Sequence, residues 1–505
     1  PRSRAARRAV PATGGGRAPA RARRDVMPLS WALVFLPWAG ALLLAAMRRE
    51  RPAALLNIAV SAASLLLALG LLAHPGGNQG WTHVDALNVP LVVLSFVIGL
   101  TTAVFSLGAV AAERFDPLRL RAYHVAFQVF MGAQALALLA DNMGVMWVAV
   151  EIATLASVLI VAVHGTPPAI EAAWKLFILC GVGIALALFG TIVLYLAAQP
   201  VVGHGDDGLS WAVLRGLAAR CDPGVLNLAF VFLLVGYGTK AGLVPLHAWL
   251  PDAEAEGPIA ISAVLSGLLL NAALHAVVRA KAIIAAHPGT VPPGPFLVAF
   301  GLASLLLAAF ALWRRRDARR LFAWSSIEHM GLAAIAFGMG GATANLAGLL
   351  HMLGHSLCKS AVFFGIGHAA QVKGSQKIAD IGGLAVTRPA LGWGLALAIA
   401  AVAGLPPFAL FASEFLLLTE AAAMRPWLIL PLGIGLLVAA AGLVQALQAL
   451  CLGDPTPDAA DPPAALAART ALGALWLHLG LALMLGVALP ASLSALLAAG
   501  AQVPG

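Results

Sequence analysis

The chain has 505 residues, of which 61% are hydrophobic and only 10% are charged. A water-soluble domain of ordinary size cannot bury that much apolar surface, so the composition excludes a soluble enzyme and predicts an integral membrane protein. The formal net charge is +9, and its excess comes from eight arginines in residues 1–26. This segment has no apolar run, and Met27 directly precedes the first one, so we expect residues 1–26 to be a disordered basic extension outside the native protein.

Apolar runs long enough to cross about 30 Å of hydrocarbon as helices recur along the rest of the chain. They predict an all-α integral membrane protein with about 14 transmembrane helices. The predicted spans are 31–47, 53–72, 89–112, 123–140, 143–163, 172–198, 226–249, 258–285, 295–313, 321–340, 344–368, 389–419, 427–452 and 470–498.

The loops between these spans carry an uneven distribution of positive charge. One set of alternate loops holds fifteen lysines and arginines, five of them between 314 and 320, and the other set holds only five. Because Lys and Arg are retained on the cytoplasmic side, the sequence predicts a bacterial inner-membrane protein with both termini in the periplasm.

A short motif occurs twice, at 241–252 (AGLVPLHAWLPD) and at 403–414 (AGLPPFALFASE). The offset of 162 residues predicts two five-helix repeats of inverted topology, at 123–285 and 295–452, each with one broken helix. Helices in 27–122 would precede the repeats, and one helix at 470–498 would follow them. A simple proline kink is the alternative for each motif taken alone.

Ionisable residues inside the first repeat are costly in a membrane and are therefore functional candidates. Glu151 lies near the middle of the fifth span and needs a basic partner, for which Lys240 in the seventh span is the natural candidate. Lys175 either modulates Lys240 or extends to the interface. His247 follows Lys240 by seven residues, which predicts the same helix face, and Asn271 and His275 lie one turn apart on another span.

The second repeat contains a denser group. His351, His355 and Lys359 are spaced four residues apart, which stacks them along one stripe of the eleventh span. Glu328 and His329 enter the tenth span, and Glu414 follows the second broken helix. A zinc site at His351 and His355 is an alternative, but the helix carries no carboxylate and Lys359 would repel the cation, so we expect no metal. A proton path suits imidazole groups better.

At these residues the chain resembles the antiporter-like subunits shared by complex I, multisubunit cation/proton antiporters and membrane-bound hydrogenases. The resemblance is carried by TKAGLVPLHAWLPDAEAEGPIAISAVLSG, and it spans about residues 89–420. Within the family the chain is most similar to component F of the hydrogenase-4 type, as judged by LFAWSSIEHMGL, HSLCKSAVFF and GLPPFALFASEF. The resemblance implies that Glu151, Lys240, Lys359 and Glu414 translocate protons. It also implies a lysine where this chain has Asn271.

The sequence therefore predicts a proton-translocating subunit of a hydrogenase-4 or complex I-type complex. No CxxC pair, P-loop or dinucleotide fingerprint is present, so we expect no cofactor in this chain. The expected partners are other membrane subunits, a peripheral redox module, lipids and protons or sodium, but no nucleic acid. Two alternatives stay open: a subunit of a sodium/proton antiporter or inorganic-carbon uptake complex, and a scaffold that moves no protons.

Overall fold

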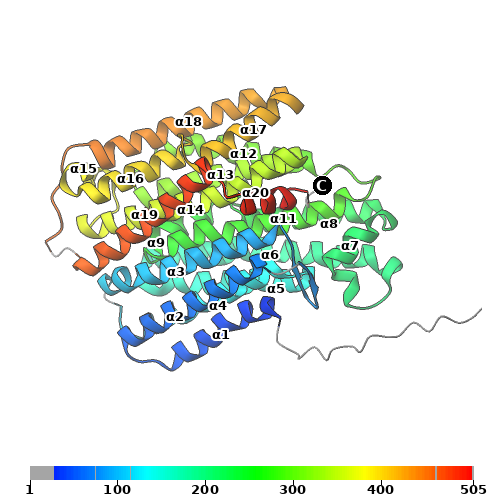
Figure 1. The fold of residues 1–505 in the computed structure, drawn as a ribbon, viewed down its shortest axis with the longest axis horizontal. Helices are drawn as coiled ribbons and strands as arrows, with labels where there is room; N and C mark the ends of the chain where they lie inside the picture. The colour runs from blue at the N-terminus through cyan, green and yellow to red at the C-terminus, as the bar shows by residue number, and fades with distance from the viewer. Residues whose placement is uncertain (1–27, 74–75, 114, 461–462, 503–505) are drawn as a thin grey trace, which may run out of the picture.

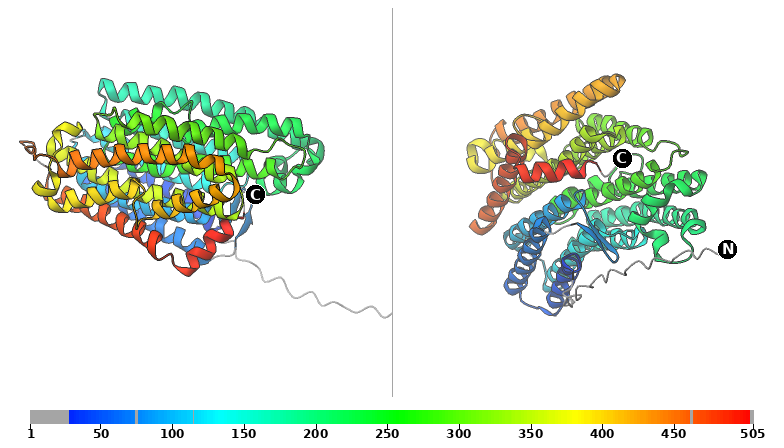
Figure 2. Two further views of the ribbon diagram at one scale, coloured as in Figure 1. Left: turned by 90° about the horizontal axis from the view of Figure 1, so that it is seen from above. Right: turned by 45° about the vertical axis from the view of Figure 1, so that its right-hand side comes forward.

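The structure is a computed structural model that describes residues 28–73, 76–113, 115–460 and 463–502. These residues form mostly helices, and the longest ones lie side by side with roughly parallel axes (Figure 1). Viewed from two other directions, the same helices keep this alignment (Figure 2). The all-α class is thus confirmed, while the expected disorder of residues 1–26 concerns a segment outside the described residues.

The helices between residues 29 and 217 are α1 (Leu29–Ala46), α2 (Glu50–Gly70), α3 (Asn88–Ala112), α4 (Pro117–Leu139), α5 (Met143–Val161), α6 (Pro167–Val202) and α7 (Trp211–Leu217). Those of the middle are α8 (Pro223–Lys240), α9 (Trp249–Glu256), α10 (Ile261–Val264), α11 (Leu270–Ala285), α12 (Gly294–Leu312), α13 (Ala318–Met339) and α14 (Ala342–Lys373). The last are α15 (Leu384–Thr387), α16 (Pro389–Val402), α17 (Ala409–Met424), α18 (Ile429–Leu447), α19 (Ala465–Val487) and α20 (Ala491–Gly500).

Several helices begin where the sequence supplies a capping residue next to an apolar run. The side chains of Asp116, Asn142, Asp222 and Asp317 accept hydrogen bonds from backbone N–H groups in the first turns of α4, α5, α8 and α13. Such caps satisfy donors that have no partner within the helix. The caps therefore fix where these four helices begin.

Twelve helices in the described ranges are long and apolar enough to cross a membrane, or up to thirteen if a sharply bent pair counts as one span. Two of the predicted spans fail this test. In α13, polar residues such as Glu328 and His329 lower the mean hydropathy, and the span predicted at 389–419 is divided into α16 and α17. The exceptions are therefore regions that carry charge or a helix break.

Both copies of the repeated motif coincide with an interrupted helix. After α8 the chain turns through residues 241–248 before α9 begins, and after α16 it turns through 403–408 before α17. Gly242 and Gly404 hold the same place in the motif, and both have positive φ, 76° and 69°, a region that favours glycine. The expected breaks are observed, and the inverted relationship between the two halves stays a prediction.

A short antiparallel hairpin precedes α3, formed by β1 (Gly77–Gln79) and β2 (Thr82–Val84). The sequence analysis did not predict it. The start of α1 contacts it through a 2.9 Å hydrogen bond between the Ser30 and Thr82 hydroxyls, and Gly500 at the end of α20 lies against Ala86. Both ends of the described chain therefore lie at the hairpin end of the helix bundle.

The centre of the bundle is formed by α14 and by the span that includes α10 and α11. The apolar windows of these spans are fully buried, whereas those of α2 and α18 are only 33% buried. The outer helices therefore offer apolar surface for lipid or partner subunits. Polar residues on the central helices are enclosed by protein.

Candidate functional site

The first group of buried polar residues surrounds Lys240, the last residue of α8. Lys240 is fully buried, and its ammonium group donates a hydrogen bond to the Thr154 hydroxyl on α5. The thiol of Cys180 on α6 also lies within hydrogen-bonding reach. The helix break directly after Lys240 places a cation at the interior end of α8, where the C-terminal backbone carbonyls favour positive charge.

Glu151 lies on α5, one turn before Thr154. It interacts electrostatically with Lys240, although the two side chains form no ion pair within 4.0 Å in the described residues. One carboxylate oxygen of Glu151 is buried and has no hydrogen-bond partner among the same residues. The two residues therefore interact without direct contact, and the ammonium group of Lys240 instead contacts Thr154, one turn after Glu151.

Two residues of the first half that were expected to relay protons, Lys175 and His247, do not belong to the group around Lys240. Lys175 is exposed and forms ion pairs with Glu171 and Asp252, at 2.7 and 2.8 Å, as expected of a side chain that extends to the interface. The prediction that His247 shares a helix face with Lys240 is wrong, because α8 ends at Lys240 and His247 lies in the break. Its ring instead packs edge-on against Trp324 of α13, with centroids 5.3 Å apart.

The second group of buried polar residues is a histidine cluster between α13, α14 and α17. His329 Nδ1 lies 3.2 Å from His351 Nε2, and His351 Nδ1 lies 2.9 Å from the Ser413 hydroxyl. The ring of His355 lies 5.5 Å from that of His329, and neither of its nitrogens has a hydrogen-bond partner in the described part of the chain. All three rings are buried, so the predicted stripe on α14 faces the interior.

Lys359 continues this stripe and is also fully buried. Its ammonium group donates a 2.8 Å hydrogen bond to the Phe322 carbonyl of α13 and interacts electrostatically with Glu328 and Glu254. Glu328 accepts a long hydrogen bond of 3.4 Å from Ser325, and Glu414 on α17 interacts with Glu328. The structure thus brings Glu328, His329, His351, His355, Lys359 and Glu414 together at one site.

Glu254 was missed by the sequence analysis. It lies on α9, immediately after the first helix break, and is fully buried, with both carboxylate oxygens lacking a hydrogen-bond partner within the described ranges. Helical spacing could have identified it. Asp252 and Glu256, four residues apart, lie on the partly exposed face of α9 that pairs with Lys175 and Arg320, so the acid between them is expected to face inward.

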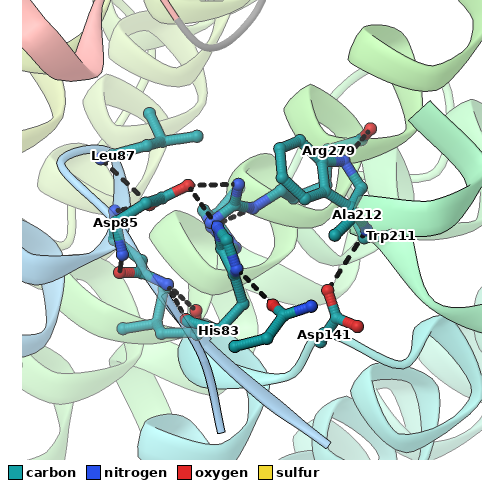
Figure 3. A network of polar contacts seen from close by, with 11 residues as sticks. His83, Asp85, Leu87, Asp141, Trp211, Ala212 and Arg279 are labelled. Carbon is teal, nitrogen blue, oxygen red and sulfur yellow. Dashed lines mark hydrogen bonds and ion pairs between the residues drawn. The ribbon is translucent and has the colours of Figure 1, made fainter. Parts of the chain in front are cut away.

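Asn271 and His275 lie on α11, as predicted, but they have different neighbours. Asn271 donates a 2.8 Å hydrogen bond to Ser356 on α14. His275 accepts a 3.1 Å hydrogen bond from Arg279, which pairs at 2.6 Å with Asp85 just before α3. Figure 3 shows Arg279 between Asp85 and Trp211. His275 therefore belongs to a network at the hairpin end of the bundle.

The geometry of the histidine cluster would also allow a metal ion to bind. His329, His351 and Glu414 each place a ligand atom within 4.8 Å of the others, and two imidazoles with a carboxylate form a known zinc donor set. The carboxylate that α14 lacks is supplied by α17. However, His329 and His351 already share a hydrogen bond, which suits proton exchange between rings, and the expectation that no metal binds stays a prediction.

These features, a bundle of membrane-spanning helices with two breaks and buried Lys, His and Glu residues, define an antiporter-like membrane subunit. Residues 140–439 match the family described as NADH:quinone oxidoreductase/Mrp antiporter, transmembrane. The chain belongs to this family.

The chain is 48% identical over 431 residues to the hydrogenase-4 component F homolog of Methylacidiphilum infernorum (isolate V4), covering 85% of this chain and 90% of that protein. Two solved structures share the fold. One is the membrane-bound sulfane sulfur reductase, an archaeal respiratory membrane complex, with a TM-score of 0.83, 22% identity and coverage of 94% and 97% of the two chains. The other is the Mrp complex from Dietzia sp. DQ12-45-1b, with a TM-score of 0.79, 20% identity and the same coverage.

Proposed function

We propose that this chain is the proton-translocating subunit of a hydrogenase-4 or complex I-type complex. The proposal is carried by one observation about Lys240 and Lys359. Both lysines are fully buried, and each lies among buried polar groups in otherwise apolar helices. Each buried charge costs about 2.5–3.5 kcal/mol on membrane-insertion scales. A protein that used these helices only as a scaffold would be more stable with apolar side chains there.

Protons suit these groups better than sodium ions do. Sodium, like other hard cations, prefers several oxygen ligands, whereas the two groups contain lysine ammonium groups and imidazole nitrogens. Both kinds of group take up and release protons, and imidazole can accept at one nitrogen while it donates from the other. A nearby lysine also repels a metal cation, so the composition of the groups favours proton transfer.

The proposed path joins the two groups through α9. A change in the neighbouring subunit would alter the distance between Glu151 and Lys240 and so release the Lys240 proton. Glu254 lies on the chain segment that follows Lys240 and interacts electrostatically with Lys359, so it is the natural acceptor between them. From Lys359 the proton would reach the histidine cluster and Glu414.

The charge pattern supports an orientation in the membrane, and the relatives support a role beside other subunits. The arginine-rich end of the bundle would face the cytoplasm of a bacterial inner membrane, and the hairpin end, with both termini, would face the periplasm. Hydrogenase or dehydrogenase-like subunits would supply the driving reaction. This chain would supply no redox centre.

The test is proton translocation by membrane vesicles that contain the complex and are given its electron donor. Lys240→Met and Lys359→Met should each lower the number of protons moved per turnover at least tenfold, because methionine keeps the side-chain volume but carries no proton. Lys377→Met is the matched control, since Lys377 is exposed on a loop at the arginine-rich end, and it should pump like the unmodified protein.

Unimpaired proton translocation in both buried-lysine variants, with the complex assembled, would refute the proposal and favour a scaffold role. Proton movement that depends on added sodium would favour the antiporter alternative.

A further inference from the structure

An unassigned polar chain runs along α11 toward the hairpin end of the bundle. Asn271, His275 and Arg279 succeed one another at four-residue intervals, so they lie on one stripe of the helix. Their exposed fractions are 3%, 1% and 2%. The stripe leads from Ser356 on α14, the helix that carries His351 and His355, to Asp85 outside the membrane-spanning helices.

Arg279 is held from several directions. Its NH1 group pairs with Asp85 Oδ2 at 2.6 Å, and its guanidinium carbon lies 4.2 Å from the centre of the Trp211 ring. The Trp211 indole donates a 3.0 Å hydrogen bond to the Arg279 carbonyl. Asp85 is itself fixed by hydrogen bonds from the backbone N–H groups of Leu87 and Asn88 (Figure 3).

The contact between Arg279 and His275 determines which nitrogen of the neutral imidazole carries the proton. Arginine only donates hydrogen bonds, so the 3.1 Å contact from Arg279 Nε requires His275 Nε2 to accept. Neutral His275 therefore carries its proton on Nδ1. That nitrogen has no hydrogen-bond partner among the residues that the structure describes, and neither has the buried Oδ1 of Asn271 one turn earlier.

We propose that His275 is the proton-carrying group at the outer end of the path and that Arg279, anchored by Asp85 and Trp211, is an electrostatic gate over it. The proposal rests on the proposed function, which it extends to the face opposite the arginine-rich loops. While Arg279 occupies Nε2, the ring cannot take a second proton without bringing two cations into contact.

Proton transfer then requires a brief loss of the Arg279–His275 hydrogen bond. Arg279 stays paired with Asp85, and the ring accepts one proton at one nitrogen and releases one from the other, so its net charge is restored. Asn271 does not titrate, and its hydrogen bond to Ser356 joins the stripe on α11 to α14. The gate prevents protons from returning through the chain when the complex is at rest.

The test is a passive leak, measured without any electron donor. Liposomes containing the purified complex and an internal pH dye receive a potassium diffusion potential, which drives protons through any open path. Arg279→Gln should raise the proton leak at least fivefold over the unmodified complex. Asp85→Asn, which leaves Arg279 in place but removes its anchor, should raise the leak by a smaller factor and provides a second variant should Arg279→Gln not assemble.

The decisive comparison adds a histidine substitution to Arg279→Gln. His275→Gln should return the leak to the unmodified level, because the proton carrier is gone. His478→Gln is the matched control, since His478 is equally buried but bonds to Thr101 on α3, away from this network, and it should leave the leak high.

If Arg279→Gln and Asp85→Asn do not leak, or if the leak persists after His275→Gln, the gate is refuted and the ion pair only fastens α11 to the start of α3. These outcomes are separate from those of the buried-lysine variants. A leak that depends on His275, together with normal pumping by both Lys240→Met and Lys359→Met, would refute the proposed function but keep the outer path.

Discussion

At the scale of single residues, the feature that needs explanation is the number of buried polar atoms without partners. Glu254, His355 and Asn271 all have such atoms in the described part of the chain, although an unsatisfied buried group typically costs about 1–3 kcal/mol. Glu254 follows Lys240 in the chain, His355 lies one turn before Lys359 on α14, and Asn271 lies on α11, while further such atoms lie outside these groups. Water that bridges these groups would satisfy them and conduct protons at the same time.

Glu254 gives the first residue-scale prediction. Replacing it by glutamine keeps its size but removes the group that links the first helix break to Lys359, so proton translocation should fall about tenfold with assembly unchanged. Proton movement by vesicles measures this. Glu256→Gln is the control, because Glu256 forms a 2.8 Å ion pair with Arg320 near the surface. Equal activity of the two variants would contradict the path through Glu254.

Asp85 gives a prediction about pH. Burial alone would raise the pKa of this carboxyl, but the Arg279 charge and hydrogen bonds from His83, Arg279 and Asn88 hold the pKa well below its usual range. A depressed pKa stabilises the folded state above the unfolded-state value of about 3.9, and this stabilisation is lost as the pH falls below it.

Breaking the buried pair by Asp85→Asn should therefore cost about 3 kcal/mol near neutral pH. The difference in thermal stability from the unmodified protein should stay constant down to about pH 5 and narrow below it. Thermal unfolding of the detergent-solubilised complex measures this, and a difference that widens with acid would contradict the assignment.

Many residues of the candidate site could be selected from the sequence, because a charged residue within an apolar span is easily recognised and costly in a membrane. The stripe of His351, His355 and Lys359 needed only helical spacing. Glu254 and Arg279 were not selected. Glu254 lies between two acids that form ion pairs near the surface, and Arg279 lies near the end of its predicted span, so only the fold shows that both side chains are buried. His247 was misplaced because helical spacing fails across a break.

At the scale of elements, the two helix breaks position the chemistry. Each break stops a helix inside the bundle, and the chain that follows carries an acid inward, Glu254 after the first break and Glu414 after the second. The paired proline motifs predicted the two breaks. They did not predict that the chain after each break would direct an acid toward the interior of the bundle. The hairpin β1–β2 was missed because its strands have three residues each, too short for a periodic signal.

Gly404→Ala tests the second break. A Cβ atom there would collide with the Glu414 carboxylate, and the positive φ of 69° costs a residue with a Cβ about 1–2 kcal/mol. Proton translocation should fall several-fold as Glu414 is displaced. Gly480→Ala, on α19, is the matched control because no atom lies within 4 Å of its added Cβ, and a similar loss in both would contradict a specific role for the break.

At the scale of the whole molecule, the bundle has two chemically different ends. The hairpin, the Asp85–Arg279 pair and both ends of the described chain share one end, and the loop from 313 to 317, with three consecutive arginines, lies at the other end of α12. Sequence predicted this division from loop charge alone. The number of spans was predicted less well, because α13 is among the less apolar long helices and a break divides one predicted span into the shorter helices α16 and α17.

Single cysteines test the orientation. All four native cysteines are buried, so an impermeant thiol reagent should react only with an added one. In intact cells His287→Cys, at the hairpin end after α11, should be labelled from outside, whereas Arg316→Cys should react only after the membrane is opened. The reverse pattern would place the arginine-rich end outside.

The central claim is that the buried polar groups form one hydrated proton path, and the most direct measurement is an electron cryomicroscopy map of the intact complex that resolves ordered water. The account predicts water molecules that connect Lys240 to Glu254, Glu254 to Lys359, and Lys359 to Glu414. A map that shows a dry, closely packed interior between Lys240 and Lys359 would contradict it.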